Sequence, residues 1–265
     1  MTSSDDGGAP AAERPDLPVL GPMAVAVQFL TRFPVRARLM DGAALGRSVP
    51  YFPVAGLLLG AAQAALGAAF AGRLGPPLAA ALLLAAHAFL TGGLHLDGLA
   101  DVVDGLSAGH RDRARTLAIM KDSRIGAHGA AALVLALLVK WAALTPLLAR
   151  RDLWALLAFP VVARWLAVPL VVFFPYARPE GMGKPFHGGA RPWHLGLATI
   201  LAALAVGGAG GAVLLPSLAA VVAGGLAALA AWRRLGGLTG DVYGACIELA
   251  ELGFLVAAAA AGGVA

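Results

Sequence analysis

The sequence predicts an all-α fold, a polytopic integral membrane bundle of about seven transmembrane helices. Three observations lead to this prediction. Hydrophobic residues make up 59% of the 265 positions and charged residues only 13%, and the mean hydropathy of +0.79 lies outside the range of ordinary soluble domains. Seven apolar runs have about the 20 residues needed to cross the hydrocarbon core of a bilayer. The basic residues are divided unevenly among the segments that join these runs.

The apolar runs and their flanks define the expected organisation of the chain. Residues 1–18 are rich in Ser, Asp, Gly, Ala and Pro and lack the basic and apolar regions of a signal peptide, so they are expected to be a disordered tail. Residues 19–265 are expected to form a single membrane-embedded domain, in which the short apolar segment 21–31 lies at the interface. The expected spans lie near 51–72, 76–96, 127–149, 153–174, 195–213, 214–232 and 242–263.

The basic residues predict the orientation of the bundle. Fifteen of the 20 Lys and Arg residues lie before the first run or in the segments 97–126, 175–194 and 233–241. The positive-inside rule places these segments and the N-terminus in the cytoplasm and the C-terminus outside. The basic residues form no patch interleaved with aromatic residues, so the pI of 10.0 does not indicate a nucleic-acid partner.

The segment Gly92–Gly105, GGLHLDGLADVVDG, is the first candidate site. Its aspartates Asp97, Asp101 and Asp104 are four and three residues apart, which places them on one face if the segment is helical. Three crowded carboxylates repel one another, and a divalent cation that prefers oxygen ligands would remove this cost. The spacing therefore favours a metal site, and a solvated helix face is the alternative.

A compact polar segment follows at the entrance to the third run. Lys121, Asp122, Ser123 and Arg124 combine two cations with an acid and a hydroxyl, close in sequence to the aspartates. Such a group can hold the oxygens of a phosphate or pyrophosphate while carboxylates hold a bridging metal. The alternative is a positive-inside anchor with a helix cap.

Charged residues also fall inside or beside later runs. Arg164 lies within the fourth run, where its expected partner is a substrate anion or a carboxylate such as Glu248. The loop 175–193 is rich in Pro and Gly, and its Tyr176 and Arg178 suit an anionic ligand that carries a ring, although a plain connector is the alternative.

The last run carries three acids. Asp241 and Glu248 are seven residues apart and lie nearly above one another on a helix, with Glu251 about 80° away. Acids at this depth are candidates for function, and ion pairs with Arg164 or Lys140 are the alternative. The sequence GGLxxD occurs both at Gly92–Asp97 and at Gly236–Asp241, which fits two acidic helices that face one site.

Five blocks follow one another along the chain: FLTRFP (29–34), GGLHLDGLADVVDGL (92–106), IMKDSRIGAHG (119–129), YARPEGMG (176–183) and GGLTGDVYGACIELAE (236–251). In these blocks and their order, the chain resembles the cobalamin synthase family, the adenosylcobinamide-GDP ribazoletransferases. The resemblance implies a magnesium-dependent enzyme of the inner membrane with a cytoplasmic catalytic face. Such enzymes transfer the adenosylcobinamide-phosphate moiety of adenosylcobinamide-GDP to α-ribazole or α-ribazole 5′-phosphate and release GMP.

The resemblance and the residue chemistry together give a set of expected roles. The expected magnesium ligands are Asp97, Asp101 and Asp104. The expected catalytic residues are Asp101, Lys121, Asp122, Arg124, Asp241 and Glu248. The expected substrate-binding residues are Ser123, Arg164, Tyr176, Arg178 and Glu251. Asp241 or Glu248 would complete the metal shell or accept the proton of the attacking hydroxyl, and both roles stay open.

Two other classes of membrane protein compete with this interpretation. Phosphotransferases that use CDP-alcohols carry DGxxAR followed by GxxxDxxxD, whereas Gly98–Asp101 reads GLAD here and no arginine follows. Transporters tend to place ionisable residues near the bilayer midplane, whereas most of the candidates here lie at the ends of runs. The expected partners are the two substrates and the lipid bilayer, and a homo-oligomer or a biosynthetic complex is compatible with the sequence.

Overall fold

The computed structural model describes residues 20–35, 37, 41–70, 72–109 and 112–262, so the expected tail 1–18 lies outside the described residues. The regular elements in this part of the chain are helices, apart from one parallel bridge between Tyr176 and Leu238. In order, they are α1 (Leu20–Leu30), α2 (Gly42–Ser48), η1 (Val49–Tyr51), α3 (Phe52–Phe70), α4 (Pro76–Thr91), α5 (Leu94–Ala108), α6 (Arg113–Ile119), α7 (Ala127–Ala149), α8 (Leu153–Phe173), α9 (Lys184–Gly189), α10 (Trp193–Val206), η2 (Gly207–Val213), α11 (Leu214–Leu235) and α12 (Gly240–Ala261).

The helices confirm a polytopic membrane bundle. Among the described residues, five helical segments are long and apolar enough to cross a membrane, or six if the bent pair α4 and α5 counts as one span. The expected number was about seven. One span of the difference arises because the runs near 195–213 and 214–232 belong to one helical segment of 43 residues, Trp193–Leu235, which is about twice the length of one crossing. This segment is broken in η2, where Gly210 has φ 58° and ψ −142°. The count falls to five when α4 and α5, with 16 and 15 residues, are not joined into one span.

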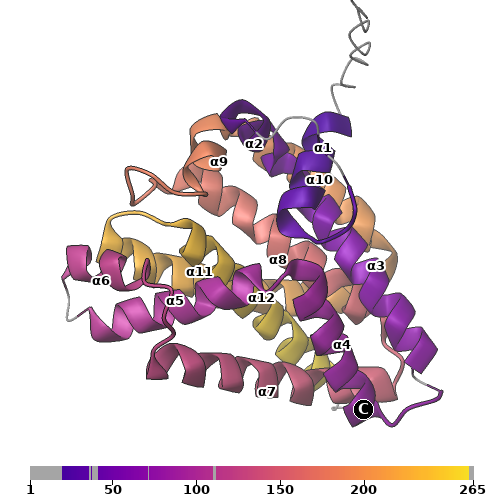
Figure 1. The fold of residues 1–265 in the computed structure, drawn as a ribbon. Helices are drawn as coiled ribbons and strands as arrows, with labels where there is room; N and C mark the ends of the chain where they lie inside the picture. The colour runs from indigo at the N-terminus through magenta and orange to yellow at the C-terminus, as the bar shows by residue number, and fades with distance from the viewer. Residues whose placement is uncertain (1–19, 36, 38–40, 71, 110–111, 263–265) are drawn as a thin grey trace, which may run out of the picture.

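The basic and the less basic segments lie at opposite ends of the bundle. α2 contacts α9 at one end, and Arg113 at the start of α6 donates hydrogen bonds there to the carbonyls of Leu235 and Ala177. At the other end, Arg150 donates to the carbonyl of Ala258 near the C-terminus. Figure 1 shows α2 and α9 far from the C-terminal end. The segments that are rich in Lys and Arg and the segments that are poor in them, which the positive-inside rule compares, therefore lie at different ends of the bundle.

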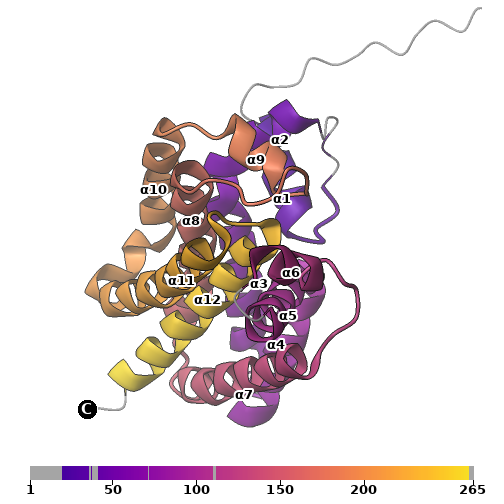
Figure 2. The same ribbon diagram turned by 90° about the vertical axis from the view of Figure 1, so that its left-hand side faces the viewer.

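α12 lies at the centre of the bundle. It packs against α11, α5, α8 and α7, and Figure 2 shows it between α11 and α5. On the other side of α8, α3 packs so closely that a Cβ on Gly60 would lie 2.1 Å from the carbonyl oxygen of Leu157. Small residues allow this approach of helix backbones, as is common in membrane bundles.

The two GGLxxD segments begin in the same way, although the helix that follows starts at Leu94 in one and at Gly240 in the other. Gly92 ends α4 with φ 65° and Gly236 ends α11 with φ 68°, both in the left-handed region that favours glycine. In each case the next helix carries the aspartate of the motif in its first turn, Asp97 in α5 and Asp241 in α12. α4 and α5 meet at 90°, so the aspartates of α5 lie beyond the end of the α4 span.

Candidate functional site

The site begins where α5 crosses the start of α12. A Cβ on Gly98 would lie 2.6 Å from the carbonyl oxygen of Asp241, and a Cβ on Gly244 would lie 3.3 Å from the Cα atom of His95. These two glycines therefore let the backbones of the helices approach each other. The contact brings the first turns of both helices together, and with them Asp97 and Asp241.

Two pockets share Asp97. One, which we call the polar pocket, is lined by Asp97 and Asp101 from α5, by Ser123, and by the Gly92–Gly93 pair between α4 and α5. The other, the apolar pocket, is lined by Asp97 and Asp241 together with aromatic and aliphatic side chains of α1, α3, α8, α9 and α12. The polar pocket also has apolar lining residues, Leu94, Ala100, Ile125 and Leu133. The structure thus places Asp97 between a pocket of mixed polarity and a mainly apolar one.

Asp97 and Asp101 have the chemistry of a partial magnesium site. Among the described residues, neither carboxylate makes a hydrogen bond or an ion pair, and the hydroxyl of Ser123 is a third oxygen at the same pocket. No group of three His, Cys, Asp or Glu side chains in the described part of the chain is arranged to hold a metal ion by itself. Magnesium is commonly held by one or two carboxylates together with substrate phosphates and water, so these donors fit the ion.

Asp104 has different partners from the other two aspartates. Its Oδ2 accepts a hydrogen bond from the backbone N–H of Gly126 at 2.7 Å, and its Oδ1 accepts one from Gly129 at 2.8 Å. These N–H groups belong to the start of α7, where a carboxylate is favoured by the unpaired donors and by the helix dipole. The buried Asp104 thus fixes α5 to the end of the loop that contains Lys121–Arg124.

The segment Lys121–Arg124 lies next to the polar pocket. Asp122 accepts hydrogen bonds from the side chain of Arg124, the shorter at 2.6 Å, and this contact lowers the pKa of Asp122 to about 2. Lys121 and Arg124 are exposed, and Ser123 lines the polar pocket. The structure therefore brings Ser123 to the aspartates and leaves both cations accessible to an anion.

Arg178 and Tyr176 come to the site from the loop after α8. Nη1 of Arg178 lies 2.9 Å from Oδ2 of Asp241, and both side chains are about four-fifths buried. The bridge between Tyr176 and Leu238 holds this loop against the start of α12. Tyr176 packs against Gly183, and its burial raises the pKa of its hydroxyl. The loop thus adds a paired cation and an aromatic ring beside the carboxylates.

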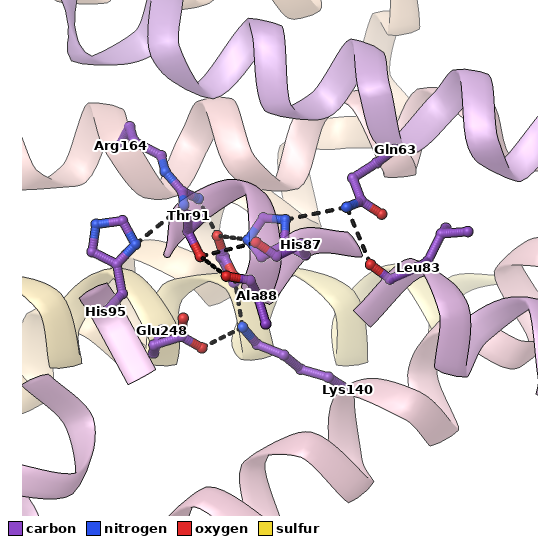
Figure 3. Close-up of polar contacts among 10 residues, drawn as sticks. Gln63, Leu83, His87, Ala88, Thr91, His95, Lys140, Arg164 and Glu248 are labelled. Carbon is purple, nitrogen blue, oxygen red and sulfur yellow. Dashed lines mark hydrogen bonds and ion pairs between the residues drawn. The ribbon is translucent and has the colours of Figure 1, made fainter. Parts of the chain in front are cut away.

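Glu248, Glu251 and Arg164 lie elsewhere, in a buried polar network within the bundle (Figure 3). Nζ of Lys140 lies 2.5 Å from Glu248 and 2.6 Å from Glu251. Glu251 also accepts hydrogen bonds from Arg164 and, at 3.0 Å, from His87. Arg164 therefore pairs with Glu251 and not with Glu248, the carboxylate partner that the sequence suggested. For Glu248 and Glu251, the structure thus has the ion pairs with Arg164 and Lys140 that the sequence offered as the alternative to a functional role.

His95 is a residue at the site that the sequence did not single out. It lies in α5 two residues before Asp97, is buried, lines the apolar pocket and contacts Arg164 of the network. Its position inside the GGLHLD motif, beside the aspartates, was the available signal. Gln63 and His87 join α3 and α4 by hydrogen bonding, which is a common role of polar residues in membrane helices.

Comparison with known proteins finds relatives that match nearly the whole chain. The family model for cobalamin-5-phosphate synthase matches residues 22–259. An adenosylcobinamide-GDP ribazoletransferase from Geotalea daltonii is 44% identical over 90% of this chain and 97% of its own length. Enzymes of the same name from Pseudomonas aeruginosa (44% identity, 89% of this chain and 96% of the relative) and a Roseiflexus species (40%, 94% and 93%) are similar. No solved structure matches the chain.

Proposed function

The chain belongs to the cobalamin-5-phosphate synthase family, and we propose that it performs its adenosylcobinamide-GDP ribazoletransferase reaction where α5 crosses the start of α12. The observation that carries this location is the meeting of Asp97 and Asp101, which lack protein partners among the described residues, with the Asp241–Arg178 pair. The resemblance of the matched sequence blocks and the identity of 40–44% to ribazoletransferases support the activity itself.

The reaction is a phosphoryl transfer from adenosylcobinamide-GDP. A hydroxyl of α-ribazole, or of its 5′-phosphate, attacks the phosphorus bound to the cobinamide side chain. The bond from this phosphorus to the bridging oxygen of the pyrophosphate breaks, GMP leaves with that oxygen, and the hydroxyl loses its proton. Enzymes of this chemistry work mainly by positioning the groups and by stabilising charge on the phosphate oxygens.

Asp97 and Asp101 are the residues that would hold magnesium, with Ser123 nearby. When bound, magnesium would supply positive charge that stabilises the pyrophosphate and the leaving GMP. Lys121 and Arg124 are exposed beside this pocket and can bind non-bridging oxygens. Asp122 orients Arg124 through its two hydrogen bonds to the guanidinium group.

Asp241 and Arg178 form the second half of the proposed centre. Arg178 neutralises phosphate oxygens, and Asp241 is positioned to accept the proton of the attacking hydroxyl because it lines the apolar pocket beside Asp97. Tyr176 supports the loop that carries Arg178. Asp104 positions the Lys121–Arg124 loop through the start of α7.

Glu248, Glu251 and Arg164 receive a positioning role in this proposal. Their side chains are buried with their charged partners inside the bundle, unlike the exposed Arg124 and the partly exposed Arg178. Arg164 is therefore not accessible to a substrate anion, and neither glutamate is free to hold a metal or accept a proton without breaking an ion pair. The network joins α4, α7, α8 and α12, and Arg164 extends it to His95 of α5. It therefore holds the helices that form the site.

The test is an assay of the full chain purified in detergent. GMP release should require both adenosylcobinamide-GDP and α-ribazole or its phosphate, and chelation of magnesium with EDTA should abolish it until the ion is restored. A CDP-alcohol donor should give no product. GMP release at an unchanged rate after chelation would contradict the magnesium assignment, and product from the CDP-alcohol alone would contradict the proposed reaction.

A further inference from the structure

The apolar pocket offers a hydrophobic surface directly beside two of the proposed reactive carboxylates. Its lining includes Phe29 of α1, Phe52 of α3 and Phe186 of α9, whose rings pack with centroids 4.6 Å (Phe29–Phe186) and 5.7 Å (Phe52–Phe186) apart. Asp97 and Asp241 line the same pocket. A ligand in this pocket would therefore have an apolar part among aromatic rings and a polar part at the carboxylates.

His95 contributes a hydrogen-bond donor to this pocket. Nη2 of Arg164 lies 3.2 Å from Nδ1 of His95. A guanidinium group has only donors, so Nδ1 must be the acceptor and the ring proton must be on Nε2. Figure 3 shows the second ring nitrogen of His95 turned away from the network. The imidazole is thus held neutral, in the tautomer with an N–H group at Nε2.

This N–H group lacks a partner. Nε2 of His95 is buried without a hydrogen bond among the described residues, and so is the hydroxyl of Tyr243, which lines the same pocket. A buried donor without a partner costs about 1–3 kcal/mol, so most such groups in proteins are satisfied. Two of them at one aromatic-lined pocket indicate a ligand that supplies the missing partners.

We propose that the apolar pocket binds the base of α-ribazole, with Nε2–H of His95 donating a hydrogen bond to the unsubstituted ring nitrogen of the benzimidazole. This inference rests on the proposed function. The base is flat and methylated, and after attachment to ribose it retains one acceptor nitrogen, which can accept from Nε2–H of His95. The hydroxyl of Tyr243, the second group without a partner, can then pair with a ribose hydroxyl of the same ligand. The ribose hydroxyls then lie towards Asp97 and Asp241.

The test compares α-ribazole with the analogue in which this ring nitrogen is replaced by C–H, an indole of the same shape. With the parent protein, kcat/KM should be about ten- to hundredfold lower for the analogue. In His95→Asn the amide oxygen can replace Nδ1 as acceptor for Arg164, but the donor at Nε2 is lost, so the preference should fall to near one. His95→Gln places an amide N–H near the position of Nε2 and should restore part of the preference.

Two measurements separate this inference from loss of fold or of the proposed function. The KM for adenosylcobinamide-GDP should be unchanged in His95→Asn, and His128→Asn, at an exposed histidine on α7, should keep the parent preference.

Equilibrium binding of the two nucleosides to the parent protein needs neither a variant nor turnover. If the parent releases GMP but does not distinguish the nucleosides in kinetics or binding, or if His95→Asn keeps the preference, the inference is wrong while the function stands. Absence of GMP release from the parent would contradict the function, and the binding measurement would still decide the inference.

Discussion

At the scale of single residues, three aspartates that share a helix face have two kinds of environment. Asp97 and Asp101 border pockets, whereas Asp104 uses both oxygens on the backbone of α7. The glycines at these contacts are also required, since a Cβ on Gly126 or Gly129 would lie within 2.4 Å of the Asp104 carboxylate. Aspartates that share one helix face therefore need not share the same chemistry.

This difference predicts that the same substitution lowers the stability of the protein at Asp104 but not at Asp101. Asp104→Asn should lower the free energy of unfolding by about 1–2 kcal/mol, because an amide can accept only one of the two N–H groups with its oxygen and turns an NH2 group towards the other. Asp101→Asn should leave the melting temperature near that of the parent. Thermal unfolding in detergent measures both, and equal stability of the two variants would contradict the capping role of Asp104.

The buried network gives a second prediction at this scale. The carboxylate of Glu251 contacts Lys140, Arg164 and His87. Glu251→Gln removes its negative charge, so the positive charges of Lys140 and Arg164 would no longer be balanced inside the bundle. The expected loss is about 3 kcal/mol or more of the free energy of unfolding. Glu180→Gln, at an exposed loop position, is the matched control and should change little. A Glu251→Gln protein as stable as the control would show that the network does not hold the bundle together.

At the scale of elements, the site depends on the glycine contact between α5 and α12. The repeated GGLxxD motif indicated two acidic helices that face one site, and both segments do end one helix at a left-handed glycine and begin the next with an aspartate. The motif does not include the residues at which α5 and α12 cross. That contact is made by Gly98 and Gly244, which lie outside the shared letters.

Gly98→Ala tests whether this close approach matters. Its new methyl group would meet the backbone of Asp241 at 2.6 Å, and backbone atoms cannot move aside as a flexible side chain can. A displacement of α5 from α12 by a fraction of an ångström should lower the rate of GMP release by about ten- to hundredfold. Gly225→Ala on α11 has open space around its Cβ and should retain the parent rate. Equal rates for the two variants would contradict the proposed location of the site.

Sequence reasoning identified most of the elements but few of their contacts. The all-helical membrane fold follows from composition and run length, and the aspartates of α5 and α12 were found from spacing. Ion pairs of the α12 acids with Arg164 or Lys140 were named as an alternative, and the structure has them for Glu248 and Glu251. The partners of Asp104 could not be predicted, because they belong to the start of α7, more than 20 residues away in sequence. The 90° bend between α4 and α5 was also missed, although the adjacent Gly92 and Gly93, both with positive φ, mark it. His95 was missed because its importance arises from the pocket and from Arg164.

At the scale of the whole molecule, the site lies near the basic end of the bundle, which we propose faces the cytoplasm of the cell in the inner membrane. Ser107→Cys near the end of α5 should then be protected in intact cells from a maleimide that cannot cross membranes. Arg73→Cys, between α3 and α4 at the other end, should be labelled. The parent is the control, because its single cysteine, Cys246, is buried. Labelling of Ser107→Cys with protection of Arg73→Cys would reverse the orientation.

The central claim is that Asp97, Asp101 and the Asp241–Arg178 pair form the reaction centre, and GMP release by folded variants tests it most directly. With adenosylcobinamide-GDP, α-ribazole and magnesium at saturating concentrations, Asp101→Asn and Asp241→Asn should each lose at least about a hundredfold in rate while remaining folded. Asp101→Asn should also keep the melting temperature of the parent. Release of GMP at the parent rate by either of these folded proteins would contradict the account.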